Sequence, residues 1–225
     1  MDLSILIPAV PDRVASHLAR LLAELDRQTL VCWSELQAGT NGGVEILALV
    51  DNYQHSVGTK RNRLLQMANG KFVTFVDDDD WISERYLSSI IGAIRDRADA
   101  DVIVYQVECT TYGTNPYVCN YSLDYEYSRV DGRWFGKPAH TMVWNAAIAK
   151  QCQFPETNFG EDMAWVKQAC ALARREHRIN DVLYHYRYNP DHTRTRDGRY
   201  TTPDVHWPGD GQPPRYRTPL TGSTP

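Results

Sequence analysis

The sequence predicts a single-domain α/β fold with a mostly parallel central sheet flanked by helices. Short, almost entirely apolar runs alternate with longer segments of helical periodicity, and turn residues separate the two. Strands that are apolar throughout indicate burial on both faces, which is typical of a parallel sheet between layers of helices. A length of 225 residues is enough for one domain with a sizeable core.

The first half of the chain predicts four strands and three helices. The strands are expected at residues 3–7, 44–50, 72–76 and 102–107. The helices, with apolar residues three and four positions apart, are expected from Asp12 through Leu25, at 59–67, and from Ser83 through Ile94. Thr59 is a candidate cap for the second helix, which Asn69 and Gly70 would end.

The second half is less regular. Residues 110–138 are rich in Tyr, Asn and Gly and predict loops with short strands. A helix is expected at 161–173, and the alternation at 182–188 predicts a strand. Residues 201–225 are rich in Pro, Gly and Thr with almost no apolar periodicity, which predicts a flexible tail.

The overall charge is −4, which argues against a generally basic nucleic-acid binder. Seven arginines nevertheless gather between residues 174 and 199. We assign Arg174, Arg175 and Arg178 to a solvated helix end and loop. The later arginines stand among histidines and tyrosines and suit phosphate recognition better.

The five cysteines are odd in number and scattered, and they form no CxxC pair. This pattern fits neither a disulfide framework nor a zinc site, and it favours a reducing compartment. No apolar run approaches the length of a membrane span, and the N-terminus lacks the features of a leader peptide. The sequence therefore predicts a cytoplasmic protein without a transmembrane segment.

Four consecutive aspartates, residues 77–80, follow the third predicted strand, and Asp51 follows the second. Ligands of open α/β sheets bind beyond the carboxyl ends of the strands, so these acids are expected to share one crevice. A buried carboxylate is costly unless it is paired, hydrogen-bonded or bound to a metal. Hard oxygen ligands suit Mg²⁺ or Mn²⁺, which bridge phosphate oxygens. The alternative is a solvated loop that caps the next helix, a role we assign to Asp80.

The residues around this run resemble family 2 glycosyltransferases of the GT-A fold. Segments 57–63 and 68–80 reproduce the family's Gly and Arg-Asn, a short helix, a Gly, a strand, and an Asp-x-Asp motif followed by another Asp. Segment 159–162 (Phe-Gly-Glu-Asp) resembles the family's Glu-Asp motif, and segment 183–187 resembles its closing strand with a Tyr-Arg ending. The resemblance covers about residues 3–197.

The resemblance implies an inverting transferase that moves a sugar from a nucleotide-sugar, a UDP-sugar, to an acceptor hydroxyl with the help of Mn²⁺ or Mg²⁺. Residues 1–110 would form the donor-binding half of the domain, and residues 111–200 the half that binds the acceptor and supplies the base. Asp162 would be the catalytic base, with Glu161 as its neighbour or substitute. The metal would be held by Asp79, Asp77 and His185. The donor contacts would come from Pro8, Asp51, Lys60, Arg61, Asn62, Asp77, Asp78, Arg187, Arg194 and Arg196.

Some assignments keep two interpretations. Arg194 and Arg196 would lie on a loop that closes over the donor. Three tryptophans are candidates to stack on sugar or acceptor rings, or else to pack in the core or at its rim: Trp81, Trp134 and Trp144. Glu161 and Asp162 are also favourable acids for the first turn of a helix. A histidine such as His185 or His192 is often structural.

The acceptor is open: a glycan, a small molecule, a protein, or hydroxymethylated bases in phage-type DNA, for which the late arginines would supply phosphate contacts. One departure from the family pattern is the segment 8–13, which lacks the usual polar or acidic pair near the nucleotide base. Two other classes of protein remain. One is a nucleotidyltransferase, although segment 8–13 lacks the Gly-rich loop with a basic residue that such enzymes carry after the first strand. The other is a non-catalytic sugar-binding module.

Overall fold

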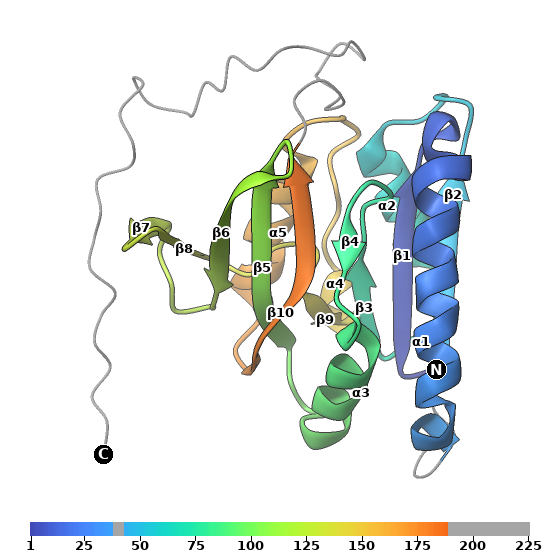
Figure 1. Cartoon of the computed structure of the whole chain (residues 1–225). Coiled ribbons are helices and arrows are strands. Elements are labelled where there is room, and N and C mark those ends of the chain that lie inside the picture. The colour runs from blue at the N-terminus through green and yellow to red at the C-terminus, as the bar shows by residue number, and fades with distance from the viewer. Residues whose placement is uncertain (38–42, 189–225) are drawn as a thin grey trace.

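The computed structural model describes residues 1–37 and 43–188 (Figure 1). The strands are β1 (Leu3–Ala9), β2 (Val44–Val50), β3 (Phe72–Phe75), β4 (Trp81–Ile82), β5 (Val102–Thr111), β6 (Thr114–Tyr121), β7 (Ser128–Val130), β8 (Arg133–Gly136), β9 (Val143–Asn145) and β10 (Glu176–Tyr188). The helices are α1 (Ala19–Gln37), α2 (Val57–Met67), α3 (Tyr86–Asp96), α4 (Ala146–Ala149) and α5 (Glu161–Leu172), with a 3₁₀ turn (Pro11–Arg13) and a π-helical turn (Val14–Leu18) before α1. The predicted flexible tail lies outside the described residues.

The predicted mostly parallel sheet is confirmed. The strand order is β2-β1-β3-β9-β5-β6-β8-β7, and β10 pairs with both β5 and β4. β1 is parallel to β2 and β3, and β5 is parallel to β10. The short strand β9 lies antiparallel between β3 and β5, so that these two run in the same direction. The sequence did not predict β9.

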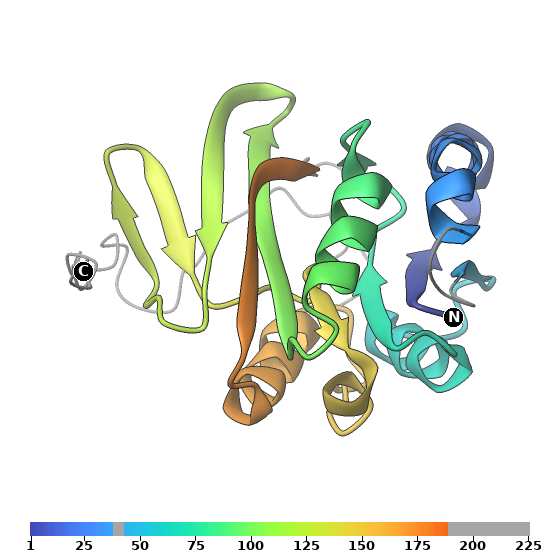
Figure 2. The same cartoon turned by 90° about the horizontal axis from the view of Figure 1, so that it is seen from below.

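Helices cover both faces of the sheet, as the apolar strands predict. Figure 2 shows α1 and α3 on one face, and α2, α4 and α5 on the other. α1 packs against α3, and α5 contacts both α2 and α4. The strands of the two predicted halves join one sheet, so the described residues form a single domain. Within the described residues, no helix is long and apolar enough to cross a membrane.

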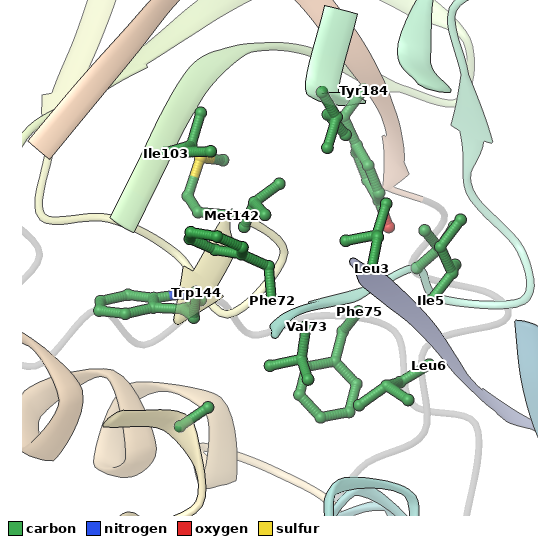
Figure 3. Packing of buried hydrophobic residues seen from close by; sticks show 14 of the residues in the cluster. Leu3, Ile5, Leu6, Phe72, Val73, Phe75, Ile103, Met142, Trp144 and Tyr184 are labelled. Carbon is green, nitrogen blue, oxygen red and sulfur yellow. The ribbon is translucent and has the colours of Figure 1, made fainter. Parts of the chain in front are cut away.

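The core fills both faces of the sheet, with buried side chains from α1 and α3 on one face and from α2 and α5 on the other, and Figure 3 shows the part of it around β1, β3 and β9. Trp144 on β9 has no exposed surface, its ring meets Trp165 edge to face at 5.4 Å, and its indole N–H donates to the Ala139 carbonyl at 3.0 Å. A side chain that is fully enclosed in this way cannot stack on an acceptor. The prediction of Trp144 as an acceptor residue is therefore wrong, and the residue is a core tryptophan.

Two helix starts differ from the prediction. α2 is capped by Ser56, whose hydroxyl accepts the Thr59 backbone N–H at 3.1 Å, so the helix begins before Thr59 rather than at it. α3 begins at Tyr86 rather than Ser83, because the Tyr86 N–H donates to the Ser83 carbonyl and Ser83 itself donates its N–H to Leu183 on β10.

Candidate active site

The four aspartates form the loop after β3, beside the ends of β1 and β2 (Figure 1). The Val76 N–H donates to the Leu6 carbonyl at 3.0 Å and keeps the chain alongside β1 up to this loop. Asp51 follows β2 directly, and β2 ends in register with β1. The predicted meeting of the two acidic segments at one edge of the sheet is confirmed, since all three strands are parallel.

Arg13, from the turn after β1, binds two of the aspartates. Its guanidinium lies 2.9 Å from an oxygen of Asp78 and 2.9 Å from an oxygen of Asp79. The other oxygen of Asp78 accepts the Val10 backbone N–H at 2.9 Å. Asp78 is thus buried and anchors the acidic loop to the end of β1, whereas the Asp79 side chain is 34% exposed.

Asp80 does not serve the following helix, and that prediction is wrong. Its carboxylate accepts the Tyr184 hydroxyl at 2.7 Å and the Arg187 backbone N–H at 3.0 Å, both on β10. The Tyr184 hydroxyl in turn accepts the Asp77 backbone N–H at 3.1 Å. Burial raises the pKa of Asp80 well above its usual value, and the charges of Asp79 and Asp77 add to this. Asp80 therefore ties the acidic loop to β10.

Arg61 connects the acidic loop with the start of α5. Its guanidinium lies 2.7 Å from an Asp77 oxygen and 2.6 Å from a Glu161 oxygen, and it is buried near the rings of Phe75 and Phe154, at 5.8 and 5.6 Å. A buried arginine needs such partners because an unpaired buried charge is costly. The described partners of Arg61 are side chains of the protein itself, and its contact with a donor stays a prediction.

The pKa values of the two carboxylates at Arg61 are shifted in opposite directions. Burial disfavours the charged form of Asp77, but Arg61 and His140 outweigh it and hold the pKa of this carboxyl well below its usual range. Burial raises the pKa of Glu161 above its usual value although Arg61 opposes the shift. Asp77 is thus an ionised group, while Glu161 is a buried carboxyl group whose ionised form is stabilised by Arg61.

Lys60 joins the ends of β1 and β2. Its buried ammonium donates to the Ala9 carbonyl at 2.8 Å and to Asp51 at 3.1 Å. The other Asp51 oxygen accepts the His55 backbone N–H at 2.7 Å. Burial works against ionisation of Asp51, but Lys60 and this N–H prevail and lower its pKa below the usual value. The carboxylate is charged and fixed where β2 ends, as its predicted role beside a nucleotide requires.

The loop that leads into α5 is docked on α2. The Gly58 N–H donates to the Thr157 carbonyl at 3.1 Å, and a Cβ at position 58 would lie 1.8 Å from the Pro155 carbonyl oxygen, so only glycine fits there. The Asn62 amide donates to the Phe154 carbonyl at 2.8 Å and accepts the N–H of the same residue at 2.9 Å. Asn62, predicted to lie beside the donor, therefore positions the loop that carries Glu161.

Asp162, beside Glu161 at the start of α5, is the open carboxylate of the pair. Its side chain is 37% exposed, against 7% for Glu161. One Asp162 oxygen accepts the Met163 N–H at 2.8 Å, and the other lies 3.9 Å from Nδ1 of His140. Nε2 of His140 lies 3.6 Å from Asp77. The acidic loop and Asp162 are thus two carboxylate centres on either side of one buried histidine.

His140 is a site residue that the sequence did not reveal. It belongs to the segment between β8 and β9, which carries no motif and no helical or strand periodicity. Its position depends on β9 returning between β3 and β5, a pairing that brings together residues far apart in the sequence. The only signal in the sequence was a histidine shortly before an apolar run.

The family model for glycosyl transferase family 2 matches residues 28–152, which is more than half of the chain. This chain belongs to glycosyl transferase family 2. The matched segment contains the acidic loop, Arg61 and His140. Because the chain belongs to this family, the predicted alternative of a nucleotidyltransferase is excluded.

The chain matches two curated relatives over only part of their length. EpsH of Bacillus subtilis is 25% identical over 150 residues, 62% of this chain and 44% of EpsH. The poly(ribitol-phosphate) β-N-acetylglucosaminyltransferase TarS of Staphylococcus aureus is 27% identical over 132 residues, 57% of this chain and 23% of TarS. The chain therefore spans less than half the length of either relative that it matches.

Solved structures of TarS share the fold. The complex of TarS 1-349 with UDP-GlcNAc gives a TM-score of 0.61 at 20% identity and covers 89% of this chain and 62% of that one. The complex of the same fragment with UDP gives 0.58 at 21% identity, with 85% and 62% covered. The GT-A fold expected from the family motifs is confirmed.

The three residues predicted as metal ligands do not form a cluster in this family 2 chain. Asp77 faces Arg61 and His140, and His185 on β10 lies 3.1 Å from Glu108. Within residues 1–37 and 43–188, no group of three or more His, Cys, Asp or Glu side chains could hold a metal ion. His185 is therefore engaged with β5, the strand next to it.

The negative charges around Asp79 favour the binding of a cation there. Burial raises its pKa to about 6, Arg13 opposes this, and the charges of Asp77 and Asp78 add to it. A second positive charge near Asp79 would relieve this repulsion. Mg²⁺ in nucleotide enzymes is commonly bound by one or two carboxylates together with substrate phosphates, and a site of that kind fits the residues present.

The remaining predicted donor and acceptor residues have these positions. Pro8 is buried on β1, next to the Ala9 carbonyl that Lys60 binds. Arg187 has an exposed side chain, and its backbone N–H binds Asp80. Arg194, Arg196 and His192 lie outside the described residues. Trp81 follows the acidic loop, and the guanidinium of Arg20 lies 5.2 Å from the centre of its ring. Trp134 lies on β8, at the far side of the sheet from β2, and packs near Tyr117 on β6 and Arg129 on β7.

Proposed function

We propose that this protein transfers a sugar from a nucleotide-sugar, a UDP-sugar, to an acceptor hydroxyl with inversion at the anomeric carbon and with a divalent cation. The observation that carries the proposal is the pairing of two unlike carboxylate centres across His140: the acidic loop on one side, and the exposed Asp162 on the other. Membership in family 2 and the fold shared with nucleotide-sugar complexes of TarS support it.

The donor belongs beside the acidic loop. Asp51, held ionised by Lys60, would bind the nucleoside at the end of β2, and Asp77 would bind the ribose. Asp79 would hold the divalent cation together with phosphate oxygens of the donor. Such a cation acts as a Lewis acid for the charge that develops on the leaving diphosphate. Arg13, whose guanidinium lies 2.9 Å from oxygens of both Asp78 and Asp79, would add a positive charge beside that diphosphate.

The acceptor belongs beside Asp162. In the reaction, a bond forms between the acceptor oxygen and the anomeric carbon, and the bond from that carbon to the diphosphate breaks on the opposite face. The proton of the hydroxyl goes to a carboxylate base within hydrogen-bond reach. The transition state resembles the oxocarbenium ion of glycoside hydrolysis.

Asp162 suits the role of base better than Glu161. Glu161 is buried with its oxygen 2.6 Å from the Arg61 guanidinium, so its charge is already neutralised and its surface is closed. Asp162 exposes 37% of its side chain and, among the described residues, forms no ion pair with an arginine or lysine, although the charge of Arg61 acts on it from a greater distance. Glu161 is a positioning residue that fixes the first turn of α5 to Arg61.

No described contact favours DNA as the acceptor. Arg174 donates to carbonyls at the end of α5, Arg175 lies 3.0 Å from Asp101, and Arg178 lies 2.9 Å from Glu176. The assignment to a helix end and loop is confirmed for Arg174 and Arg175, which lie between α5 and β10, and is wrong for Arg178, which is a residue of β10.

A donor screen tests the proposal. Melting temperature and sugar-nucleotide hydrolysis are measured with UDP-glucose, UDP-N-acetylglucosamine, UDP-galactose and GDP-mannose, each with Mn²⁺ or with EDTA. We expect at least one UDP-sugar to stabilise the protein and to release UDP in the presence of Mn²⁺. Asp79→Asn should lose the Mn²⁺ effect, while Asp96→Asn, an exposed acid on α3, should retain it. No response to any donor would refute the proposal.

A further inference from the structure

An exposed aromatic and thioether surface lies beside Asp162. Tyr127, just before β7, is 48% exposed, and Met163, the residue after Asp162, is 51% exposed. The Tyr127 hydroxyl lies 3.9 Å from the Met163 sulfur. We call these two side chains the Tyr127–Met163 platform. Large apolar side chains that touch one another at the surface beside a reactive group indicate a binding site more than isolated ones do.

The Tyr127 ring of the platform has two neighbours. One side of the Tyr127 ring lies against the backbone of Gly136 at the end of β8, where an added Cβ would come within 2.8 Å of the ring. The hydroxyl end of the ring is held at Met163. The ring thus contacts the protein on one side, and about half of the residue's surface remains exposed to a ligand.

The platform adjoins the carboxylate. The Met163 N–H donates to Asp162, so the two residues share one turn of α5. Burial raises the pKa of Tyr127 to about 12, and the charges of Cys170 and Asp162 add to this, which places the phenol within the electrostatic range of Asp162. Four residues after Gly136, the chain reaches His140, whose ring lies 3.9 Å from Asp162. The exposed platform and the exposed carboxylate of Asp162 are thus neighbours at the start of α5.

We propose that the Tyr127–Met163 platform binds the C–H face of a pyranose ring in the acceptor, so that the enzyme extends a glycan. The inference rests on the proposed role of Asp162, because the reacting hydroxyl must lie within hydrogen-bond reach of that base. A pyranose whose hydroxyl meets Asp162 presents its ring to the adjacent platform. Aromatic rings give a flat sugar face a large apolar contact at low entropy cost. An acyclic polyol has no such face.

Saturation-transfer NMR tests the proposal directly. The probes are methyl β-D-glucopyranoside, methyl N-acetyl-β-D-glucosaminide and the acyclic polyol ribitol, each with the full chain, UDP and Mn²⁺. The variants are Tyr127→Ala, Tyr127→Phe, and Tyr112→Ala as a control, since Tyr112 is an exposed tyrosine at the β5–β6 turn. UDP affinity and melting temperature are measured for each variant as a check on the donor site and on folding.

We expect at least one pyranoside to bind with its ring C–H protons saturated most strongly. Tyr127→Ala should weaken that binding roughly tenfold, whereas Tyr127→Phe and Tyr112→Ala should change it less than about twofold. UDP affinity should be the same in all variants. If UDP binds but neither pyranoside is saturated, if ribitol is saturated equally, or if Tyr127→Ala binds like the unmodified protein, the inference fails while the proposed donor chemistry stands. If UDP itself does not bind, the proposed function fails as well.

Discussion

Replacement of Arg61 by methionine removes the charge that joins the acidic loop to α5. Methionine keeps an apolar side chain near the rings of Phe75 and Phe154, while two carboxylates, Asp77 and Glu161, lose a partner at 2.7 and 2.6 Å. Removal of one member of a buried ion pair costs about 3–5 kcal/mol, because the remaining charge is left without compensation. We expect about 3 kcal/mol, since the Asp77 side chain is partly exposed and still faces His140.

The loss should depend on pH. In the unmodified protein Arg61 opposes the upward pKa shift of Glu161, so Arg61→Met raises this pKa further above the value of 4.5 that applies in the unfolded chain. The folded variant then binds a proton at a higher pH than the unfolded chain does. Its extra cost is present above the folded pKa and disappears as the pH falls toward 4.5. The difference from the unmodified protein should be larger at pH 7.5 than at pH 5.

Urea unfolding followed by tryptophan fluorescence measures the effect, since Trp144 and Trp165 are core residues. A loss of about 3 kcal/mol corresponds to a melting temperature roughly 10 °C lower in a chain of this size. Arg61→Met combined with Glu161→Gln should recover part of the loss, because one stranded charge is removed. A loss below about 1 kcal/mol at pH 7.5, or a double variant no more stable than Arg61→Met, would refute the role of Arg61.

Three further changes have expected outcomes. Gly58→Ala places a methyl group against the Pro155 carbonyl and should lower the free energy of unfolding by about 2 kcal/mol or more in urea, and an unchanged value would contradict the docking of that loop on α2. Tyr184→Phe removes the hydroxyl between Asp80 and the Asp77 N–H and should cost about 1–3 kcal/mol in the same assay, whereas no loss would argue against this link. The rise in melting temperature on adding Mn²⁺ and UDP should be larger at pH 7.5 than at pH 5 and absent in Asp79→Asn. The pKa of Asp79 is raised to about 6, and a cation binds the ionised form that prevails above it, so an equal rise at both pH values would contradict this assignment.

Strands with a continuous apolar pattern were predictable because burial on both faces leaves a plain signature in the sequence. β1, β2 and β3 occur within two residues of the predicted ranges, and the acids that follow them meet as expected. β9 has three residues, too few for any periodicity, and only its pairing with β3 and β5 makes it a strand. Trp144 was misassigned for the same reason, since its environment depends on that pairing.

Motifs located the site, but they did not assign every side chain. The acidic run is continuous in the sequence, yet its side chains divide among three partners. Asp77 pairs with Arg61, Asp78 and Asp79 pair with Arg13, and Asp80 binds β10. Asp80 was taken for a helix acid because its bond to Tyr184 joins residues about a hundred positions apart. His140 was missed because no local pattern marks it, and only tertiary packing brings it between Asp77 and Asp162.

The central claim is that Asp162 is the base on the acceptor side of a nucleotide-sugar site, and one pair of measurements tests it most directly. For Asp162→Asn, the rate of UDP release from the best donor with Mn²⁺ is compared with the affinity for UDP. The account predicts a fall in kcat of about 10²–10⁴-fold with UDP affinity unchanged, because the base acts on the attacking hydroxyl and does not bind the donor. A kcat within about threefold of the unmodified protein would contradict it.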